Sequence, residues 1–149
     1  MRPSPGANMK DSNDMLRILV VDDSPISRKL AEYALTGKPY EMFFAESARQ
    51  ALNMVVSHRP DVVITDWLMP DLSGLDLCRM IRNKLKCRDT YLILLTTNSR
   101  EDHIEEGLAA GADGYLTKPL RSDELLGQIR TARSTVKARR EMVAKKSLL

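Results

Sequence analysis

Residues 16–25 read LRILVVDDSP, and this stretch decides the fold. The run LRILVVD at 16–22 is rich in branched apolar residues and ends in an acid, which predicts a buried β-strand followed by a turn. Ser24 and Pro25 then predict the start of a helix, because Ser is a good N-cap and Pro fits the first helical turn. A strand that leads directly into a helix is the unit from which parallel sheets are built.

The rest of the chain repeats this alternation of strand and helix. After a first helix at residues 25–35, the same patterns predict four more strands and four more helices. The further strands are expected at residues 40–45, 61–66, 91–96 and 114–117. The further helices are expected at residues 48–58, 75–86 and 100–110 and from about residue 122 onward.

The character of the strands predicts their places in the sheet. Segments 16–22, 61–66 and 91–96 are almost entirely apolar, as expected of strands that are buried on both faces. Segment 40–45 is mixed and segment 114–117 is very short, so these two are expected at the edges. Right-handed crossovers then favour the flavodoxin-like strand order 2-1-3-4-5. The sequence therefore predicts an α/β fold with a single doubly wound, five-stranded parallel sheet and an extended C-terminal helix.

Length and composition fit one domain. The 149 residues are 43% hydrophobic and 29% charged, which is enough for a buried core. No apolar run approaches the roughly 18 residues of a membrane span, and residues 1–14 lack the apolar region of a signal peptide. Cys78 and Cys87 match no metal-ligand spacing and are expected to be reduced thiols in a cytoplasmic protein. We expect a disordered leader at 1–14, a domain at 15–133, and at 134–149 a basic helical extension or linker to an output domain.

Positive charge is concentrated in the C-terminal helix. Residues 121–149 carry a net charge of +5 and residues 1–120 a net charge of −2. A basic helix can bind nucleic acid or a membrane surface, or it can be a solvated helix face. The solvated face is favoured, because no aromatic residues alternate with the basic ones and no groove-reading motif is present. We therefore expect neither nucleic acid nor a membrane among the partners of this chain.

Polar residues gather where the predicted strands end. The carboxyl ends of parallel strands lie on one edge of a sheet, and ligands bind there at the point where the strand order reverses. Alone, each of these residues could be a helix cap, a turn residue or a surface lysine. Their coincidence at one edge predicts a site, made of Asp22, Asp23, Asp66, Thr96 and Lys118.

The residue types at this edge point to phosphoryl chemistry. Three clustered carboxylates raise one another's pKa, and a hard divalent cation relieves this repulsion. Oxygen ligands with open positions suit Mg²⁺, which can neutralise a phosphoryl group while one carboxylate acts as the nucleophile. A dinucleotide-binding fold or a flavodoxin would instead need a glycine-rich or hydroxyl-rich phosphate loop after the first strand. Here that place is taken by the acids Asp22 and Asp23.

Four motifs in order carry a family resemblance. They are DDSP at 22–25, DWLMPDLSG at 66–74, TT at 96–97 and GYLTKP at 114–119. With them, about residues 16–133 resemble the receiver domain of two-component response regulators, of the kind found in chemotaxis regulators. The resemblance implies a signalling module rather than an enzyme. It also implies a phosphoryl donor, either a histidine kinase or a phosphotransfer protein.

The resemblance further implies a role for each acidic residue. Asp66 would be the phosphoacceptor in a Mg²⁺-dependent reaction. Asp23, Asp66 and the backbone carbonyl of Leu68 would bind Mg²⁺ directly, and Asp22 would contribute through a water molecule. Thr96 and Lys118 would be the catalytic partners of Asp66, because both would contact the phosphoryl group.

A switch and a cis peptide bond are also implied. Phosphorylation would draw the Thr96 hydroxyl inward, and Tyr115 would fill the vacated space. The alternative for Tyr115, an ordinary half-buried residue of the edge strand, is less favoured. The movement would bias the surface formed by residues 100–110, 114–117 and the last helix, where an output domain or partner protein binds. A second copy of the chain is a further candidate partner. The family also leads us to expect a cis peptide bond before Pro119.

Two other interpretations remain. The chain could be a pseudo-receiver that binds proteins and never accepts phosphate, but such a module would have lost an acid or the lysine, and none is lost here. It could also be a flavin- or nucleotide-binding enzyme of the same fold, which the acidic loop after the first strand argues against.

Two residues near the site bear on the lifetime of the phosphoryl group. By the resemblance, Leu68 and Asn98 lie at the mouth of the pocket. Leu68 offers no polar group to position a hydrolytic water, so we expect slow loss of phosphate. Asn98 could offset this effect.

The end of the last helix leaves its role open. Ile129, Ala132, Val136 and Val143 follow a marginal heptad that Arg139 interrupts. The segment resembles the signalling helices that join some receivers to an output domain. The chain is therefore either a receiver from a longer protein or a single-domain regulator.

Overall fold

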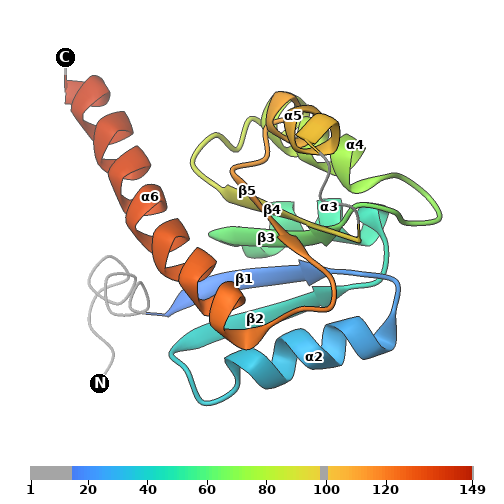
Figure 1. Ribbon diagram of the computed structural model, residues 1–149. Coiled ribbons are helices and arrows are strands. Elements are labelled where there is room, and N and C mark those ends of the chain that lie inside the picture. Colours follow the sequence, from blue (N-terminus) through green and yellow to red (C-terminus); the bar gives the residue numbers. More distant parts are fainter. Residues whose placement is uncertain (1–14, 98–100, 149) are drawn as a thin grey trace.

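The computed structural model describes residues 15–97 and 101–148 and contains one five-stranded parallel sheet with helices on both faces (Figure 1). The strand order is β2-β1-β3-β4-β5, as the sequence predicted. The strands are β1 (Leu16–Val21), β2 (Tyr40–Ala45), β3 (Val62–Asp66), β4 (Tyr91–Thr96) and β5 (Gly114–Thr117). The helices are α2 (Pro25–Leu35), α3 (Ala48–His58), α4 (Gly74–Arg79), the π-helix η1 (Met80–Lys84), α5 (Glu101–Ala109) and α6 (Ser122–Leu148).

Helix α2 begins where its capping residue predicts. The Ser24 side chain accepts a hydrogen bond from the backbone N–H of Ser27 at 3.3 Å, and Pro25 occupies the first turn. The cap satisfies one of the N–H groups that a helix start leaves unpaired. Because the helix begins so soon after β1, Asp22 and Asp23 are held in a tight turn at the carboxyl edge of the sheet.

The two faces of the sheet have separate cores. Helices α2 and α6 cover one face, where Leu35 and Ile129 pack against strand residues such as Ile18 (Figure 1). Helices α3, α4 and α5 and the π-helix cover the other face, where Ile81 packs against strand residues such as Leu92. All six residues of β4 are buried, which confirms that this apolar strand is covered on both faces.

One helix differs from the sequence prediction. Residues 75–86 were expected to form a single α-helix, but α4 ends at Arg79 and a π-helix follows it. The physical reason is the Arg82 side chain, which donates to the carbonyl oxygens of Gly111, Cys87 and Thr90 at 2.7–3.0 Å. The wider turn lets this arginine reach acceptors far along the chain while Ile81 stays fully buried.

Helix α6 packs on the sheet for most of its length. Ile129, Ala132 and Val136 are buried in the core, so the apolar pattern that resembled a heptad is the face that packs on the sheet. Val143, the last member of that pattern, is 59% exposed. Among the described helices, none is both long enough and apolar enough to span a membrane.

Candidate functional site

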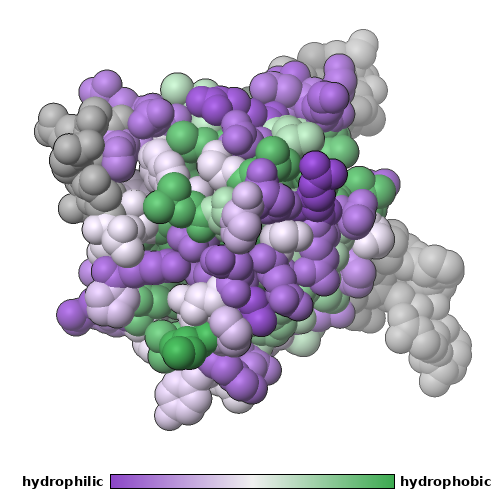
Figure 2. All heavy atoms as spheres, turned by 90° about the vertical axis from the view of Figure 1, so that its right-hand side faces the viewer, coloured by the Kyte–Doolittle hydropathy of each residue, from purple (hydrophilic) through white to green (hydrophobic). Residues whose placement is uncertain are grey.

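The carboxyl edge of the sheet brings together the side chains that the strand ends predicted. Asp22 follows β1, Asp66 ends β3 and Lys118 follows β5, and their side chains meet because these strands are parallel. The Lys118 Nζ lies 3.0 Å from Oδ2 of Asp22 and 3.3 Å from Oδ2 of Asp66. Viewed from this edge, the molecule shows hydrophilic side chains across the middle of its surface (Figure 2).

Asp23 completes an acidic cluster at this edge. One carboxylate oxygen each of Asp22, Asp23 and Asp66 lies within 4.8 Å of the others. Among the described residues, this is the one group of three or more acidic, histidine or cysteine side chains with that spacing. The cluster sets three carboxylates against the single ammonium of Lys118, and its ligand atoms are all hard oxygens. Both features fit a divalent cation such as Mg²⁺.

The electrostatics of the site favour the binding of a cation. Burial and then the charge of Asp22 raise the pKa of Asp66 above 3.8, although Lys118 and the backbone N–H of Leu68 act in the opposite direction. Burial alone would lower the pKa of Lys118, but its hydrogen bond to Asp22 and the charge of Asp66 outweigh burial and raise the pKa. Lys118 is therefore fully charged at neutral pH, and it only partly compensates the carboxylates.

Asp22 is fixed by its own turn. It is fully buried, its Oδ1 accepts a hydrogen bond from the backbone N–H of Ser24 at 2.9 Å, and its backbone carbonyl accepts from Arg28 at 2.7 Å. Asp23, the next residue, is exposed. The turn therefore offers one rigid and one accessible carboxylate to a ligand at the same edge.

Gly74 allows the loop after β3 to close against the end of that strand. A Cβ at this position would lie 2.3 Å from the backbone oxygen of Asp66, which no side chain tolerates. Its backbone N–H donates to the carbonyl of Trp67 at 2.7 Å. The sequence interpretation used Gly74 only as the end of a motif and missed this packing role.

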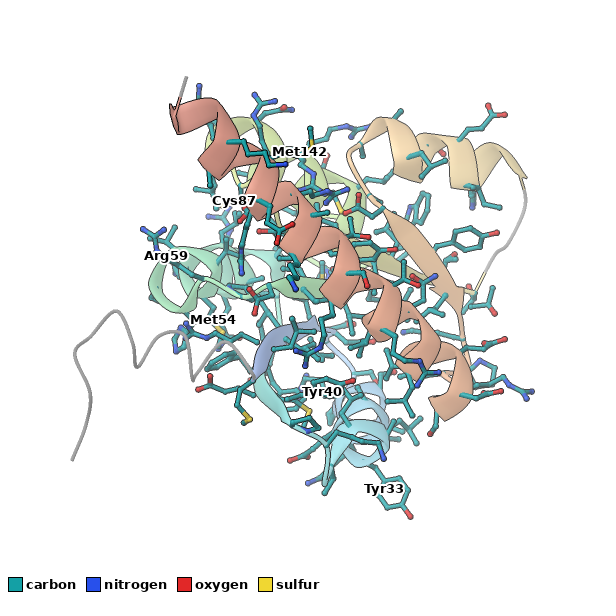
Figure 3. All side chains as sticks on the ribbon, turned by 90° about the vertical axis from the view of Figure 1, so that its left-hand side faces the viewer. Tyr33, Tyr40, Met54, Arg59, Cys87 and Met142 are labelled. Carbon is teal, nitrogen blue, oxygen red and sulfur yellow. The ribbon has the colours of Figure 1, made fainter. Side chains whose placement is uncertain are left out.

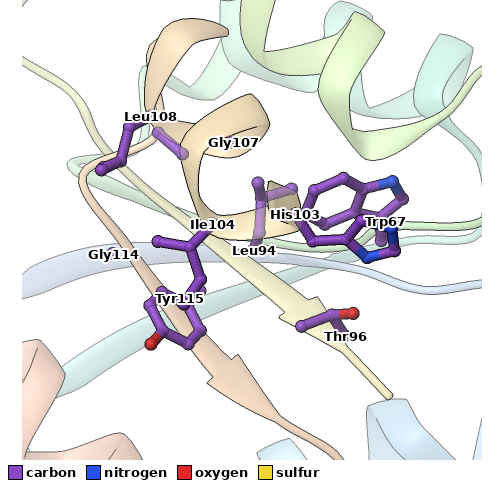
Figure 4. A pocket seen from close by; sticks show the side chains of 10 residues that line it. Trp67, Leu94, Thr96, His103, Ile104, Gly107, Leu108, Gly114 and Tyr115 are labelled. Carbon is purple, nitrogen blue, oxygen red and sulfur yellow. The ribbon is translucent and has the colours of Figure 1, made fainter. Parts of the chain in front are cut away.

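A second group of side chains lies beside Asp66. The rings of Trp67 and His103 stack with centroids 5.1 Å apart (Figure 4). Thr96 and Tyr115 border the same small cavity, whose volume of about 10 Å³ is at the lower limit for one water molecule. An aromatic ring therefore does not fit there unless neighbouring side chains move. His103 was not singled out from the sequence, because no pattern marks a helix residue that stacks on a loop tryptophan.

The remaining site predictions have different outcomes. The peptide bond between Lys118 and Pro119 is cis, as the resemblance implied. The Leu68 side chain is 73% exposed at the mouth of the site, and the ligand role of its carbonyl stays a prediction. Asn98 and the leader at 1–14 lie outside the described residues.

The fold and the site together define a phosphoacceptor-type module of the α/β class, and comparisons with known proteins agree. The response regulator receiver domain family matches residues 18–130, so the chain belongs to this family. It is 36% identical over 113 residues to the phosphate regulon transcriptional regulatory protein PhoB of Pseudomonas aeruginosa, covering 76% of this chain and 49% of that protein. It is 39% identical over 115 residues to the response regulator MprA of Mycolicibacterium vanbaalenii, covering 77% and 49%.

Solved structures give the same result. The chemotaxis protein CheY4 of Vibrio cholerae matches with a TM-score of 0.75 and 32% identity, covering 79% of this chain and 98% of that one. The signal receiver domain of an HD domain-containing protein from Pseudomonas fluorescens matches with a TM-score of 0.79 and 30% identity, covering 86% and 93%. The chain spans about half the length of the curated relatives named above. It is thus a receiver domain of two-component signal transduction.

The electrostatics of the acidic cluster lead to a prediction about Mg²⁺ and pH. Without Mg²⁺, the raised pKa of Asp66 means that the folded chain holds a proton more tightly than the unfolded chain. The free energy of unfolding is therefore expected to fall as pH rises from about 3.8 through the folded-state pKa of Asp66. Added Mg²⁺ is expected to restore this free energy, because it binds the folded chain. Thermal unfolding with and without Mg²⁺, compared with Asp66→Asn, isolates this contribution. A wild-type midpoint that does not respond to Mg²⁺ at neutral pH would contradict the metal site, and Trp67 fluorescence gives an independent readout of binding.

Proposed function

We propose that Asp66 accepts a phosphoryl group from the phosphohistidine of a histidine kinase or phosphotransfer protein, in a reaction that depends on Mg²⁺. The observation that carries the proposal is the convergence of three carboxylates with Lys118, whose ammonium lies 3.3 Å from Asp66. Membership of the receiver family supports the choice of donor. In this role the module is the substrate of a transfer reaction and a regulator, not an enzyme with its own turnover.

The transfer can be written with its bonds balanced. A carboxylate oxygen of Asp66 attacks the phosphorus, and a P–O bond forms as the P–N bond of the donor breaks. The imidazole nitrogen leaves with the bonding electrons and takes a proton, so a neutral histidine remains. Mg²⁺, held by Asp23, Asp66 and the carbonyl of Leu68 and by Asp22 through water, would supply positive charge next to the phosphoryl oxygens.

Thr96 and Lys118 are proposed as the groups that contact the transferred phosphoryl. Lys118 already lies within ion-pair distance of Asp66, so its ammonium needs little movement to meet a phosphoryl oxygen. Thr96 ends β4, next to Asp66 in the sheet, and is 6% exposed. A lysine and a hydroxyl fixed at these places stabilise the developing negative charge without reorganisation at the moment of transfer.

Phosphorylation is proposed to reach the surface formed by α5, β5 and α6. Thr96 and Tyr115 border one cavity, so a shift of the threonine toward a new phosphoryl group enlarges the space beside the tyrosine. Tyr115 is 36% exposed, so it would move from the surface into that space only after the threonine has shifted and the cavity has widened. The two positions of Tyr115 would give the face two states, which an output domain, a partner protein or a second copy of the chain would distinguish.

The domain organisation and location are part of the proposal. We propose a leader at residues 1–14, the receiver at 15–133, and at 134–149 a basic helical extension or a linker to an output domain. The two curated relatives named above are both regulators, and the match covers only 49% of each. Their greater length supports a linker role. The free cysteines Cys78 and Cys87 support a cytoplasmic location, because reducing compartments keep thiols unpaired.

The proposal is tested by incubating the chain with acetyl phosphate and Mg²⁺ and measuring its intact mass. A single adduct about 80 Da heavier is expected, and fragmentation should map it to Asp66. The adduct should be labile in base, as an acyl phosphate is, and should fail to form in EDTA. An unmodified mass with every small phosphodonor, and no beryllofluoride binding, would sink the proposal and favour a pseudo-receiver.

The exposed Leu68 side chain leads to a prediction about phosphate loss. Leu68→Asn is expected to speed dephosphorylation by about tenfold, which corresponds to about 1.4 kcal/mol of barrier, because an amide can orient the attacking water. The decay of the purified phosphorylated chain in Mg²⁺ is the measurement. Leu30→Asn, which changes an exposed leucine of α2, is the matched control and should leave the rate unchanged. An unchanged or slower decay in Leu68→Asn would contradict the role of Leu68.

A further inference from the structure

A second charged cluster lies at the amino-terminal edge of the sheet, opposite the phosphoryl site. It pairs two adjacent arginines of α6 with three aspartates that lie just before β3, β4 and β5. Arg139 Nη2 lies 2.5 Å from Oδ1 of Asp113. Arg140 Nη2 lies 2.6 Å from Oδ1 of Asp61, and its Nε lies 2.8 Å from Oδ2 of Asp89. We call this cluster the arginine clamp: Arg139, Arg140, Asp61, Asp89 and Asp113.

The clamp is more than a set of surface ion pairs. The side chains of Asp61 and Asp113 are only 11% and 14% exposed, so these carboxylates have given up most of their hydration. Arg139 also donates to the carbonyl of Thr90 at 3.2 Å and lies over the ring of Tyr91 at 6.0 Å. Charge-assisted hydrogen bonds in such partly buried places are worth more than exposed pairs, and removal of one partner leaves a buried charge uncompensated.

The clamp acts where the hydrophobic attachment of α6 ends. Val136 is 2% exposed and belongs to the core, whereas Met142 and Val143 are 62% and 59% exposed. The helix nevertheless continues to Leu148, past the amino-terminal ends of the strands (Figures 1 and 3). A helical segment of about twelve residues is marginal in water by itself, so its order depends on its attachment to the rest of the fold.

We propose that Arg139 and Arg140 are positioning residues that fix residues 137–148 to the amino-terminal edge of the sheet and so set the direction in which α6 leaves the domain. Asp113 connects the clamp to β5, the strand that contains Tyr115. It directly precedes β5, and its carboxylate also accepts from Arg82 at 2.7 Å and from the backbone N–H of Leu92 at 2.9 Å. The same carboxylate therefore holds α6, β4 and the start of β5 in one arrangement.

Hydrogen exchange of the full chain tests the clamp. In the double variant Arg139→Gln/Arg140→Gln, amides of residues 137–148 are expected to exchange about tenfold faster or more, which corresponds to about 1.4 kcal/mol of local opening. Amides of β1 and β3 should keep their protection. The matched control is Lys137→Gln/Lys145→Gln, which removes the same charge from exposed positions of the same segment and should leave exchange unchanged.

The outcomes separate a clamp from a general effect of charge. Unchanged exchange in the arginine variant, or equal acceleration in both double variants, would overturn the proposal. If the arginine variant also loses protection in β1 and β3, Asp89→Asn decides, because Asp89 is a partner of Arg140 at the surface. Faster exchange confined to residues 137–148 in that variant supports the clamp, and unchanged exchange contradicts it.

Discussion

Replacing Asp66 with asparagine is expected to abolish phosphoryl acceptance, by at least about a thousandfold, which is the scale of losses when a nucleophile is removed. The amide keeps the shape of the side chain but lacks the anionic oxygen that attacks phosphorus. Incorporation of phosphate from acetyl phosphate in Mg²⁺ is the measurement. The fold should survive, because the variant removes a carboxylate whose pKa burial and Asp22 raise.

The matched control for this variant is Asp123→Asn. Asp123 is an exposed acid in the first turn of α6, so its loss should leave acceptance unchanged. Full incorporation in Asp66→Asn would mean that another residue accepts phosphate, and the assignment of Asp66 would then be wrong.

A methyl group added at Gly74 is expected to destabilise the domain by about 3 kcal/mol, at the upper end of the usual cost of overpacking. The new Cβ would lie 2.3 Å from the backbone oxygen of Asp66, so the loop or the end of β3 must move. Urea unfolding of Gly74→Ala measures the loss. Since the displaced strand end carries Asp66, Mg²⁺ affinity should fall in the same variant.

Gly127→Ala adds the same methyl group as Gly74→Ala but is expected to stabilise the domain. Gly127 lies within α6, and a Cβ there would meet nothing within 4 Å. Alanine is a better helix former than glycine, so this variant should gain about 0.5–1 kcal/mol. Similar destabilisation in both variants would show that the contact at Gly74 does not control stability.

The fold could be predicted because its signals are local. The continuous apolar runs at β1, β3 and β4 predicted buried parallel strands, and the caps predicted where helices begin. The site could be predicted from topology, because parallel strands place Asp22, Asp66 and Lys118 at the same edge whatever the conformation of the loops. Periodicity and connection rules carried these predictions without any knowledge of long-range contacts.

What the sequence missed depends on contacts between distant residues. The apolar spacing of Leu75, Cys78 and Ile81 fits an α-helix, and the wider turn follows from Arg82 reaching Gly111, 29 residues away. No local pattern shows that Gly74 touches the backbone of Asp66. Such features follow from the packed structure, not from propensity.

The C-terminal part of α6 shows a third limit of prediction from sequence. The basic residues were interpreted as a solvated face, yet Arg139 and Arg140 bind aspartates. These contacts also lie beyond residue 133, where we expected the extension to begin. A signal for them existed, because Asp61 is the first residue of one predicted strand and Asp113 directly precedes another, so both must lie at the amino-terminal edge of the sheet.

The acidic cluster and the end of α6 occupy opposite edges of the sheet (Figure 1). A donor protein that reaches Asp66 and a protein bound to the last turns of α6 therefore approach from different sides and do not compete for space. If Asp66 accepts phosphate and the end of α6 contacts a downstream protein, as proposed, the two proteins would be able to bind at the same time. Phosphate would then be gained and lost without release of the downstream protein.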